Sequence, residues 1–214
     1  ETFFQFPVIR LAFRGCKSCA VGAYCNTPPI GAKRHKVEVS VRASEKPTGS
    51  VKVIILDVDG VLTDGSIIYD GEGRELKSFN TRDGQGIKMA LRAGLAVVIM
   101  TGRRSPPVSR RAEELGIKIV LQEVQDKAAA LETLLKEQGW NAAEVAYVGD
   151  DLPDIPPMRR VGLPIAVSDA APEVIQAAKY VTSRSGGKGA VREAIELILK
   201  SSGRWDALKD GYTG

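Results

Sequence analysis

The sequence predicts an α/β domain with a doubly wound parallel sheet, and three observations support that prediction. Short runs of apolar, often β-branched residues recur without polar alternation, which is typical of strands buried on both faces. Stretches with helical spacing of apolar residues lie between these runs. Glycines follow several of these stretches, as they do at the ends of helices. Strands that alternate with helices in this way form parallel sheets covered on both faces.

The expected elements follow one another in order from residue 51. A hairpin with arms over 66–69 and 75–79 is expected around the turn sequence Asp70-Gly71-Glu72-Gly73. Asp83 and Asp126 are expected to cap the helices that they precede. Strands are expected over 51–56, 95–100, 117–121, 145–148, 163–167 and 180–182, and helices over 83–93, 108–115, 126–138, 172–178 and 190–200.

Composition divides the chain into three parts. Residues 51–200 have the regular pattern and are expected to form the domain, followed by a C-terminal tail over 201–214. Residues 1–50 have poor periodicity and are expected to form a basic, poorly ordered arm. The expected location is the cytoplasm, or a plastid or other organelle if residues 1–50 are a transit peptide.

Two interpretations of the arm stay open. Its Arg-rich, acid-poor composition resembles a transit peptide with a processing site at Val41-Arg42-Ala43-Ser44, and a mis-assigned start is equally favoured. A zinc knuckle is a minor alternative, because the spacing of its candidate ligands is irregular. Those ligands are Cys16, Cys19, Cys25 and His35.

Charge and residue usage exclude several functions for residues 51–214. Residues 1–50 hold 8 of the 30 Lys+Arg and 3 of the 26 Asp+Glu, so the remainder is close to neutral and lacks the basic surplus of a nucleic-acid-binding domain. No apolar run reaches the roughly 20 residues that span a bilayer, so we expect neither a nucleic-acid nor a membrane partner. Residues 51–214 contain no Cys and no His, which excludes a Ser-His-Asp triad, a Cys nucleophile and a His or Cys zinc site.

Polar side chains follow four of the predicted strands, where ligands bind in sheets of this kind. Asp57 and Asp59 follow the first strand, Thr101 the second, Lys127 the third and Asp150 the fourth. A single Asp at a strand end is usually a turn or capping residue, but several carboxylates at neighbouring strand ends repel one another unless a cation intervenes. Oxygen ligands of this type suit Mg²⁺, so the sequence predicts a magnesium site.

This set of groups can transfer a phosphoryl group. The Asp57 carboxylate can attack phosphorus and form an aspartyl-phosphate, and Asp59 can protonate the leaving alcohol and then activate water. Thr101 can donate its hydroxyl and its backbone N–H to phosphoryl oxygens, while Lys127 adds a positive charge. The sequence therefore predicts a Mg²⁺-dependent phosphomonoester hydrolase.

The same residues resemble the four motifs of the haloacid dehalogenase-like phosphatases, over about residues 51–200. They are Asp57-Val58-Asp59-Gly60-Val61-Leu62-Thr63-Asp64-Gly65, Thr101-Gly102-Arg103, Lys127 and Gly149-Asp150-Asp151. The resemblance implies that Asp57 is the nucleophile, that Asp59 is the acid/base, and that both join Asp150 around the metal. It also implies phosphate binding by Thr101, Gly102 and Lys127, and supporting roles for Asp151 and Asp154.

A second set of segments resembles the capless branch of this family whose substrate is a phosphorylated sugar acid. They are the hairpin, Asn80-Thr81-Arg82-Asp83-Gly84 and Gly186-Gly187-Lys188-Gly189, in which Lys188 replaces the usual Arg. The resemblance implies hydrolysis of 3-deoxy-D-manno-octulosonate 8-phosphate in lipopolysaccharide biosynthesis, by a homotetramer. A nonulosonate 9-phosphate is the alternative substrate. The candidate substrate-binding residues are Arg82, Arg103, Lys188 and Arg192.

Other classes of function explain the motifs less well. A phosphoacceptor signalling domain also places an Asp, a Thr and a Lys at the edge of a parallel sheet, but it does not need an acid/base two residues after the acceptor, as Asp59 is here. A non-catalytic regulatory or binding module would leave the carboxylate cluster unexplained.

Overall fold

The computed structural model describes residues 51–213, with side chains up to residue 211. The predictions made for residues 1–50, namely the basic arm, its processing site and its cysteine and histidine ligands, lie outside the described residues. Among the described residues, no helix is long and apolar enough to cross a membrane.

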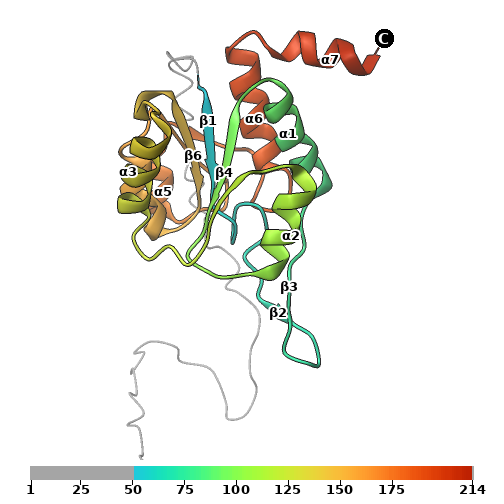
Figure 1. The fold of residues 1–214 in the computed structure, drawn as a ribbon, viewed down its shortest axis with the longest axis vertical. Helices are drawn as coiled ribbons and strands as arrows, with labels where there is room; N and C mark the ends of the chain where they lie inside the picture. Colours follow the sequence, from blue (N-terminus) through green and yellow to red (C-terminus); the bar gives the residue numbers. More distant parts are fainter. Residues whose placement is uncertain (1–50, 214) are drawn as a thin grey trace, which may run out of the picture. The chain divides into compact units, whose positions relative to one another are not determined.

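A six-stranded parallel sheet forms the centre of the domain (Figure 1), as the sequence predicts. Its order is β5-β4-β1-β6-β7-β8, so the chain first builds outward from β1 on one side and then on the other. The carboxyl end of β1 therefore lies at the switch point, where such sheets open a crevice. The bounds are β1 Val53–Leu56, β4 Ala96–Met100, β5 Ile119–Leu121, β6 Val145–Gly149, β7 Leu163–Ala166 and β8 Tyr180–Val181.

Helices cover both faces of the sheet (Figure 1). The central strands β1 and β6 are buried throughout, because both of their faces pack against helices. One face carries α1 Thr81–Arg92, α2 Pro106–Leu115 and α6 Ala190–Ser201; the other carries α3 Lys127–Gln138 and α5 Pro172–Ala177, with α4 Ile155–Met158 packed between them.

The helix ends show where local sequence signals decide the structure. Asp126 caps α3 as predicted, accepting the N–H groups of Ala128 and Ala129 at 2.9 Å each. The prediction that Asp83 caps the first helix is wrong: Asn80 caps α1 and accepts the N–H of Arg82 at 2.8 Å. Asp83 is instead buried and accepts the N–H groups of Gly189 at 3.2 Å and Arg192 at 2.7 Å. It therefore ties α1 to the start of α6.

The predicted hairpin is present and forms a separate two-stranded sheet, with shorter strands than expected. They are β2 Ile68–Tyr69 and β3 Glu75–Leu76, and we call residues 66–79 the flap. Asp70 closes the turn, because its carboxylate accepts the N–H groups of Glu72 and Arg74 at 2.9 Å each. The flap is the only insertion between β1 and α1, and no cap domain occurs among the described residues, which agrees with the capless prediction.

The sequence reasoning missed several short elements. Residues 201–214, expected as a tail, contain the helix α7 Trp205–Thr213. Trp205 packs against the core, with the Lys200 ammonium 4.9 Å and the Arg192 guanidinium 5.6 Å from its ring centroid. The 3₁₀ turns over Ala142–Glu144 and Leu152–Asp154 and the single-turn helix α4 are too short to give a periodic pattern.

Candidate functional site

A cavity of about 490 Å³ opens at the carboxyl ends of β1, β4 and β6, at the switch point of the sheet. The residues predicted for catalysis, metal binding, phosphate binding and support all line it, as does one of the four predicted for substrate binding. They are Asp57, Asp59, Thr101, Gly102, Arg103, Lys127, Asp150, Asp151 and Asp154.

Asp57 and Lys127 form an ion pair at the floor of this cavity. Asp57 directly follows β1, and its backbone N–H continues the sheet by donating to Val148 O at 3.1 Å. Lys127 is the first residue of α3, and its Nζ lies 3.0 Å from Asp57 Oδ1 and 2.7 Å from Asp154 Oδ1. All three side chains are buried, so the contact is poorly screened by solvent.

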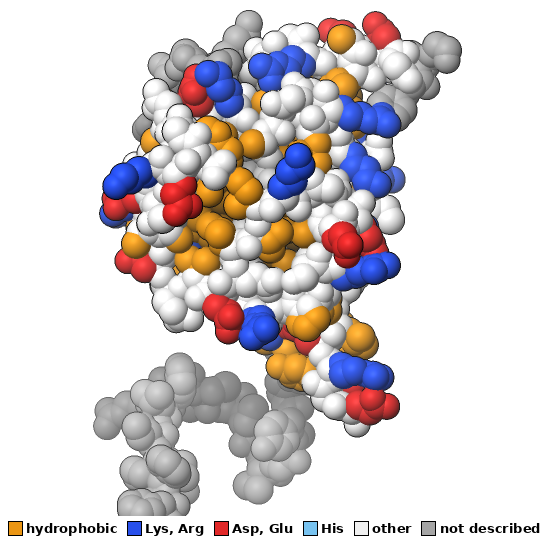
Figure 2. Space-filling model, viewed as in Figure 1, with side chains coloured by type: hydrophobic (Ala, Val, Ile, Leu, Met, Phe, Trp, Pro, Cys, Tyr) orange, Lys and Arg blue, Asp and Glu red, His pale blue; other side chains and the backbone are white. Residues whose placement is uncertain are grey.

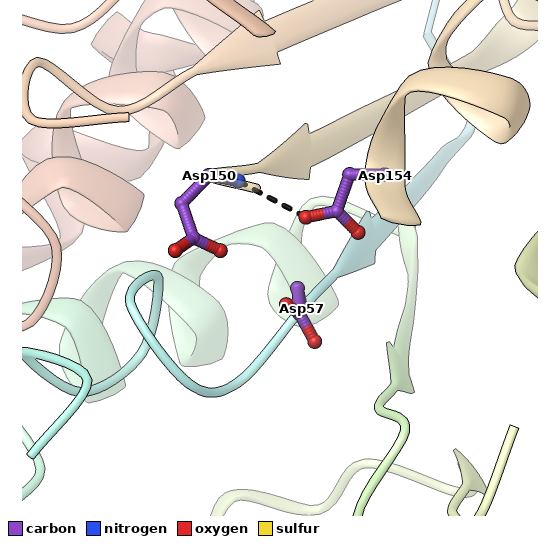
Figure 3. A group of neighbouring side chains, drawn as sticks. All are labelled: Asp57, Asp150 and Asp154. Carbon is purple, nitrogen blue, oxygen red and sulfur yellow. Dashed lines mark hydrogen bonds between the residues drawn. The ribbon is translucent and has the colours of Figure 1, made fainter. Parts of the chain in front are cut away.

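Three carboxylates meet beside this ion pair. Figure 3 shows Asp57, Asp150 and Asp154 converging from the end of β1, the end of β6 and the turn before α4. One oxygen of each lies within 4.8 Å of the others. Buried oxygens without a hydrogen-bond partner include Asp150 Oδ1 and Asp59 Oδ2. The oxygens of Asp57, Asp59 and Asp150 are hard donors of the kind that fit a divalent cation such as Mg²⁺, and Asp154 adds negative charge beside them.

The electrostatics of the site also favour a cation. Burial raises the pKa of Asp57 to about 7, with a further contribution from the charge of Asp154 and an opposing one from Lys127. Burial, followed by the charges of Asp57 and Asp154, raises the pKa of Asp150 to about 8. Burial lowers the pKa of Lys127, but its two carboxylate partners outweigh that effect and the pKa is raised overall. The single ammonium of Lys127 therefore does not neutralise the negative charge of these carboxylates, and a bound cation would stabilise their ionised forms.

Gly60 lets the loop after β1 pass close to Asp150. Its φ of +85° lies in the left-handed region, and a Cβ there would lie 2.0 Å from Asp150 Oδ2. A second glycine, Gly186, supports the same loop from outside, since a Cβ on it would lie 1.7 Å from Gly60 O. The Gly186-Gly187 pair therefore has a packing role that the sequence reasoning did not consider.

Thr101 is buried at the end of β4, and one of its predicted contacts is excluded. Its backbone N–H donates to Leu121 O at 2.9 Å, because it continues the ladder between β4 and β5. The prediction that this N–H donates to a phosphoryl oxygen is therefore wrong, because the group is already used in the sheet. The hydroxyl stays in the site and accepts the N–H of Arg103 at 3.3 Å.

Asp151 and Asp154 differ in what they support. The prediction left open whether Asp151 supports the metal or Lys127. Its side chain accepts the N–H of Leu152 at 2.8 Å and caps the following turn. Of these two residues, Asp154 is the one whose carboxylate contacts Lys127.

The flap contributes charged groups that the sequence reasoning missed. Lys77, whose side chain is only 1% exposed, forms an ion pair with Asp59 Oδ1. Glu75 contacts Arg103 Nη2 at 2.8 Å and Lys77 Nζ at 3.4 Å. Alternation along a strand places Glu75 and Lys77 on the same face, and that spacing is the signal that could have revealed them.

Three predicted substrate-binding residues lie elsewhere in the described part of the chain. Arg82 and Arg192 line a second cavity of about 480 Å³ near the start of α6. Lys188, 65% exposed, lies 3.6 Å from Asp64 Oδ2. Only Arg103 lies beside the catalytic carboxylates, with its Nε 3.7 Å from Asp59 Oδ2.

Known proteins share this sequence pattern and fold. Residues 117–195 match the family model of haloacid dehalogenase-like hydrolases. The chain is 47% identical over 160 residues to the 3-deoxy-D-manno-octulosonate 8-phosphate phosphatase KdsC of Escherichia coli K12, which covers 75% of this chain and 85% of that protein.

Solved structures agree. The 3-deoxy-D-manno-octulosonate 8-phosphate phosphatase of Moraxella catarrhalis, in complex with magnesium, phosphate and KDO, has a TM-score of 0.75 and 42% identity, covering 76% of this chain and 94% of that one. The cobalt-bound form of the Haemophilus influenzae phosphatase has a TM-score of 0.69 and 44% identity, covering 72% and 90%.

The fold and the carboxylate site define the class of this protein as a haloacid dehalogenase-like hydrolase. The sequence identity to named relatives extends over most of the chain and identifies a narrower family within that class. The chain belongs to the family of 3-deoxy-D-manno-octulosonate 8-phosphate phosphatases. The family resemblance predicted from the sequence is thereby confirmed.

Proposed function

We propose that this chain hydrolyses 3-deoxy-D-manno-octulosonate 8-phosphate to the free sugar acid and inorganic phosphate, with Mg²⁺ as cofactor. One observation supports this most strongly: a buried Asp57 whose carboxylate faces Lys127, with Asp59 and Asp150 at the same cavity. The family membership supplies the substrate, because the named relatives act on it.

The proposed reaction begins at the Asp57 carboxylate. One oxygen attacks phosphorus, the bond to the sugar oxygen breaks, and Asp59 donates a proton to that oxygen. Lys127 and the Thr101 hydroxyl hold phosphoryl oxygens during the transfer. Asp59 then takes a proton from water, which attacks the aspartyl-phosphate and releases phosphate. Asp57, Asp150 and the backbone carbonyl of Asp59 would hold Mg²⁺, which shields the carboxylates from the phosphoryl charge.

The flap and the loop after β4 supply the proposed contacts to the sugar. Glu75, Lys77 and Arg103 surround Asp59, the group that must meet the leaving oxygen. Arg82, Lys188 and Arg192 lie outside this cavity within one chain. We therefore propose that these three residues contact the substrate bound in a neighbouring subunit, and not the substrate in their own chain.

A homotetramer is the proposed assembly. Four large apolar side chains of the flap are exposed, and Figure 2 shows apolar side chains gathered at the flap, at the lower right. Exposed apolar clusters of this kind mark protein interfaces. The four are Ile67, Ile68, Tyr69 and Leu76.

Other parts of the proposal come from the family alone. A role in lipopolysaccharide biosynthesis and a cytoplasmic location are proposals of this kind. An organelle is the alternative location if residues 1–50 are a transit peptide.

Phosphate release from a panel of phosphorylated sugar acids, with Mg²⁺, tests the proposal. We expect a strong preference for the octulosonate 8-phosphate, lost in Asp57→Asn and kept in Asp206→Asn, an exposed control in α7. Equal turnover of a nonulosonate 9-phosphate would contradict the substrate but not the chemistry. No Mg²⁺-dependent release from any ester would contradict the enzyme assignment and favour a phosphoacceptor domain.

A further inference from the structure

Tyr147 is a fully buried polar side chain below the active-site cavity, and the reaction above does not use it. It lies on β6, three residues before Asp150, and its hydroxyl donates to Asp154 Oδ1 at 2.8 Å. Burial, with the nearby charges of Asp154 and Asp57, raises the pKa of Tyr147 well above its ordinary value. The hydroxyl is therefore a permanent donor at neutral pH.

Asp154 receives four hydrogen bonds, which satisfy both of its oxygens. Oδ1 accepts from the Tyr147 hydroxyl and from Lys127 Nζ at 2.7 Å. Oδ2 accepts the backbone N–H groups of Asp150 at 3.0 Å and Asp151 at 3.3 Å. Two donors on each oxygen occupy its lone pairs, so Asp154 offers none to an ion although it belongs to the carboxylate cluster.

Asp154 instead connects two parts of the active site. On one side it holds the ammonium of Lys127, which lies 3.0 Å from Asp57 Oδ1. On the other side it holds the backbone that carries Asp150. A carboxylate in this place must keep one rotamer, because rotation would move both the ammonium and the loop.

We infer that Tyr147 is a positioning residue for the phosphatase reaction: its hydroxyl fixes the Asp154 carboxylate so that Lys127 points at Asp57 and the bound phosphoryl group. The inference rests on the function proposed above. Without the hydroxyl, one lone pair of Asp154 Oδ1 is left buried and unsatisfied, and Asp154 draws Lys127 toward itself. The ammonium then lies farther from the transferred phosphoryl oxygens.

Tyr180 supplies a matched control. Its hydroxyl also donates to a carboxylate, Glu193 Oε1, at 2.9 Å, but it lies on β8 at the edge of the sheet. Tyr147→Phe and Tyr180→Phe each remove one hydroxyl that donates to a carboxylate. A purely structural role for both tyrosines predicts similar, small effects on activity.

The test is steady-state kinetics of Tyr147→Phe and Tyr180→Phe with the octulosonate 8-phosphate. We expect kcat of Tyr147→Phe to fall about tenfold, the effect of one hydrogen bond to a charged group, and inhibition by inorganic phosphate to weaken by a similar factor. The Mg²⁺ concentration for half-maximal activity should not change, and Tyr180→Phe should match the wild type. Wild-type kcat and phosphate inhibition in Tyr147→Phe would overturn the inference.

Two further variants separate positioning from loss of structure. Binding of inorganic phosphate, measured by calorimetry, should be the same in Lys127→Ala and in Lys127→Ala/Tyr147→Phe, because Tyr147 acts through Lys127; an added loss would overturn the inference. Asp154→Asn should lower kcat without changing the Mg²⁺ requirement, whereas a large rise in that requirement would make Asp154 a metal ligand. Inactive wild type would instead contradict the proposed function.

Discussion

The carboxyl edge of the sheet and the flap are built in opposite ways. The edge takes its side chains from the ends of β1 and β6, whose residues are fully or almost fully buried. The flap has two residues in each strand, and it leaves Ile67 53%, Ile68 43%, Tyr69 60% and Leu76 48% exposed. Packing in the hydrophobic core holds the residues of the edge in place, while few side chains of the flap are buried.

This difference suggests that the edge and the flap have different roles in the proposed reaction. Groups that attack, transfer and hold charge need fixed positions, and they come from the edge. Groups around Asp59, the proposed acid/base, come partly from the flap, through Lys77 and Glu75. We therefore propose that the phosphatase chemistry depends on the buried strands, and that the choice of substrate depends on the flap, a short segment with exposed apolar side chains.

The largest effect is expected at Gly60, on the edge. Gly60→Ala forces a Cβ against Asp150 and strains a backbone at φ +85°, so we expect kcat to fall at least about a hundredfold, with a higher Mg²⁺ requirement. Gly71→Ala, in the flap turn, has no atom within 4 Å of the new Cβ and should match the wild type. Equal activity of the two variants would show that the edge tolerates displacement.

A smaller effect is expected when the flap loses its link to the edge. Lys77→Met keeps most of the side-chain volume but removes the ammonium that pairs with Asp59 Oδ1, leaving Asp59 with only its longer contact to Arg103. We expect kcat/KM to fall by roughly tenfold to a hundredfold. Thermal unfolding should change little, and Lys88→Met, on the exposed surface of α1, is the control. Unchanged kinetics in Lys77→Met would make the flap irrelevant to the acid/base.

These predictions also show what the sequence could and could not provide. Asp57, Thr101, Lys127 and Asp150 were predictable because strand ends in a parallel sheet must meet at one edge. Lys77 and Asp83 were not, since their partners lie 18 residues away at Asp59 and 106 residues away at Gly189. Local rules assign such residues to a strand or a cap, and only tertiary packing decides otherwise.

The same limit applies to the acidic residues of the fourth motif. Asp151 follows Asp150 directly and was a natural candidate to support Lys127, but its side chain caps a turn. Asp154 reaches Lys127 because a 3₁₀ turn over Leu152–Asp154 brings it back under the site. A turn of three residues is too short to give a periodic sequence pattern, so the sequence does not predict it.

A more moderate effect is expected on the pH dependence of folding stability, through the carboxylates of Asp57 and Asp150 at the edge. The pKa values of Asp57 and Asp150 are raised from 3.8 to about 7 and about 8, so the folded state binds these protons more tightly than the unfolded state. Without metal, their contribution to stability is therefore present below about pH 4 and is lost as the pH rises toward 8.

Asp150→Asn should reverse this loss. In EDTA at pH 8 we expect the variant to be more stable than the wild type by roughly 1–3 kcal/mol, and at pH 4 to match it. Mg²⁺ should raise the unfolding temperature of the wild type but hardly that of the variant. The measurement is calorimetry at both pH values with Asp206→Asn as control, and a variant less stable at pH 8 would contradict the electrostatic account.

The smallest effect on a single chain is expected from the exposed face of the flap. Ile68 pairs with Leu76 in the hairpin register, so Ile68→Ser/Leu76→Ser removes a joint apolar surface. Since neither side chain belongs to the buried core, we expect the unfolding free energy of the isolated chain to change by under about 1 kcal/mol, while light scattering shows a smaller assembly and activity falls. An assembly of unchanged mass would contradict the proposed interface.

Rapid acid quench during turnover, followed by peptide mass spectrometry, tests the central claim most directly. With the octulosonate 8-phosphate and Mg²⁺, the account predicts one transient phosphoryl group on the peptide that contains Asp57, formed and lost at rates that support kcat, and absent in Asp57→Asn. Turnover with no phosphoryl group at any time, or a phosphoryl group on a different residue, would contradict the role of Asp57 as the nucleophile.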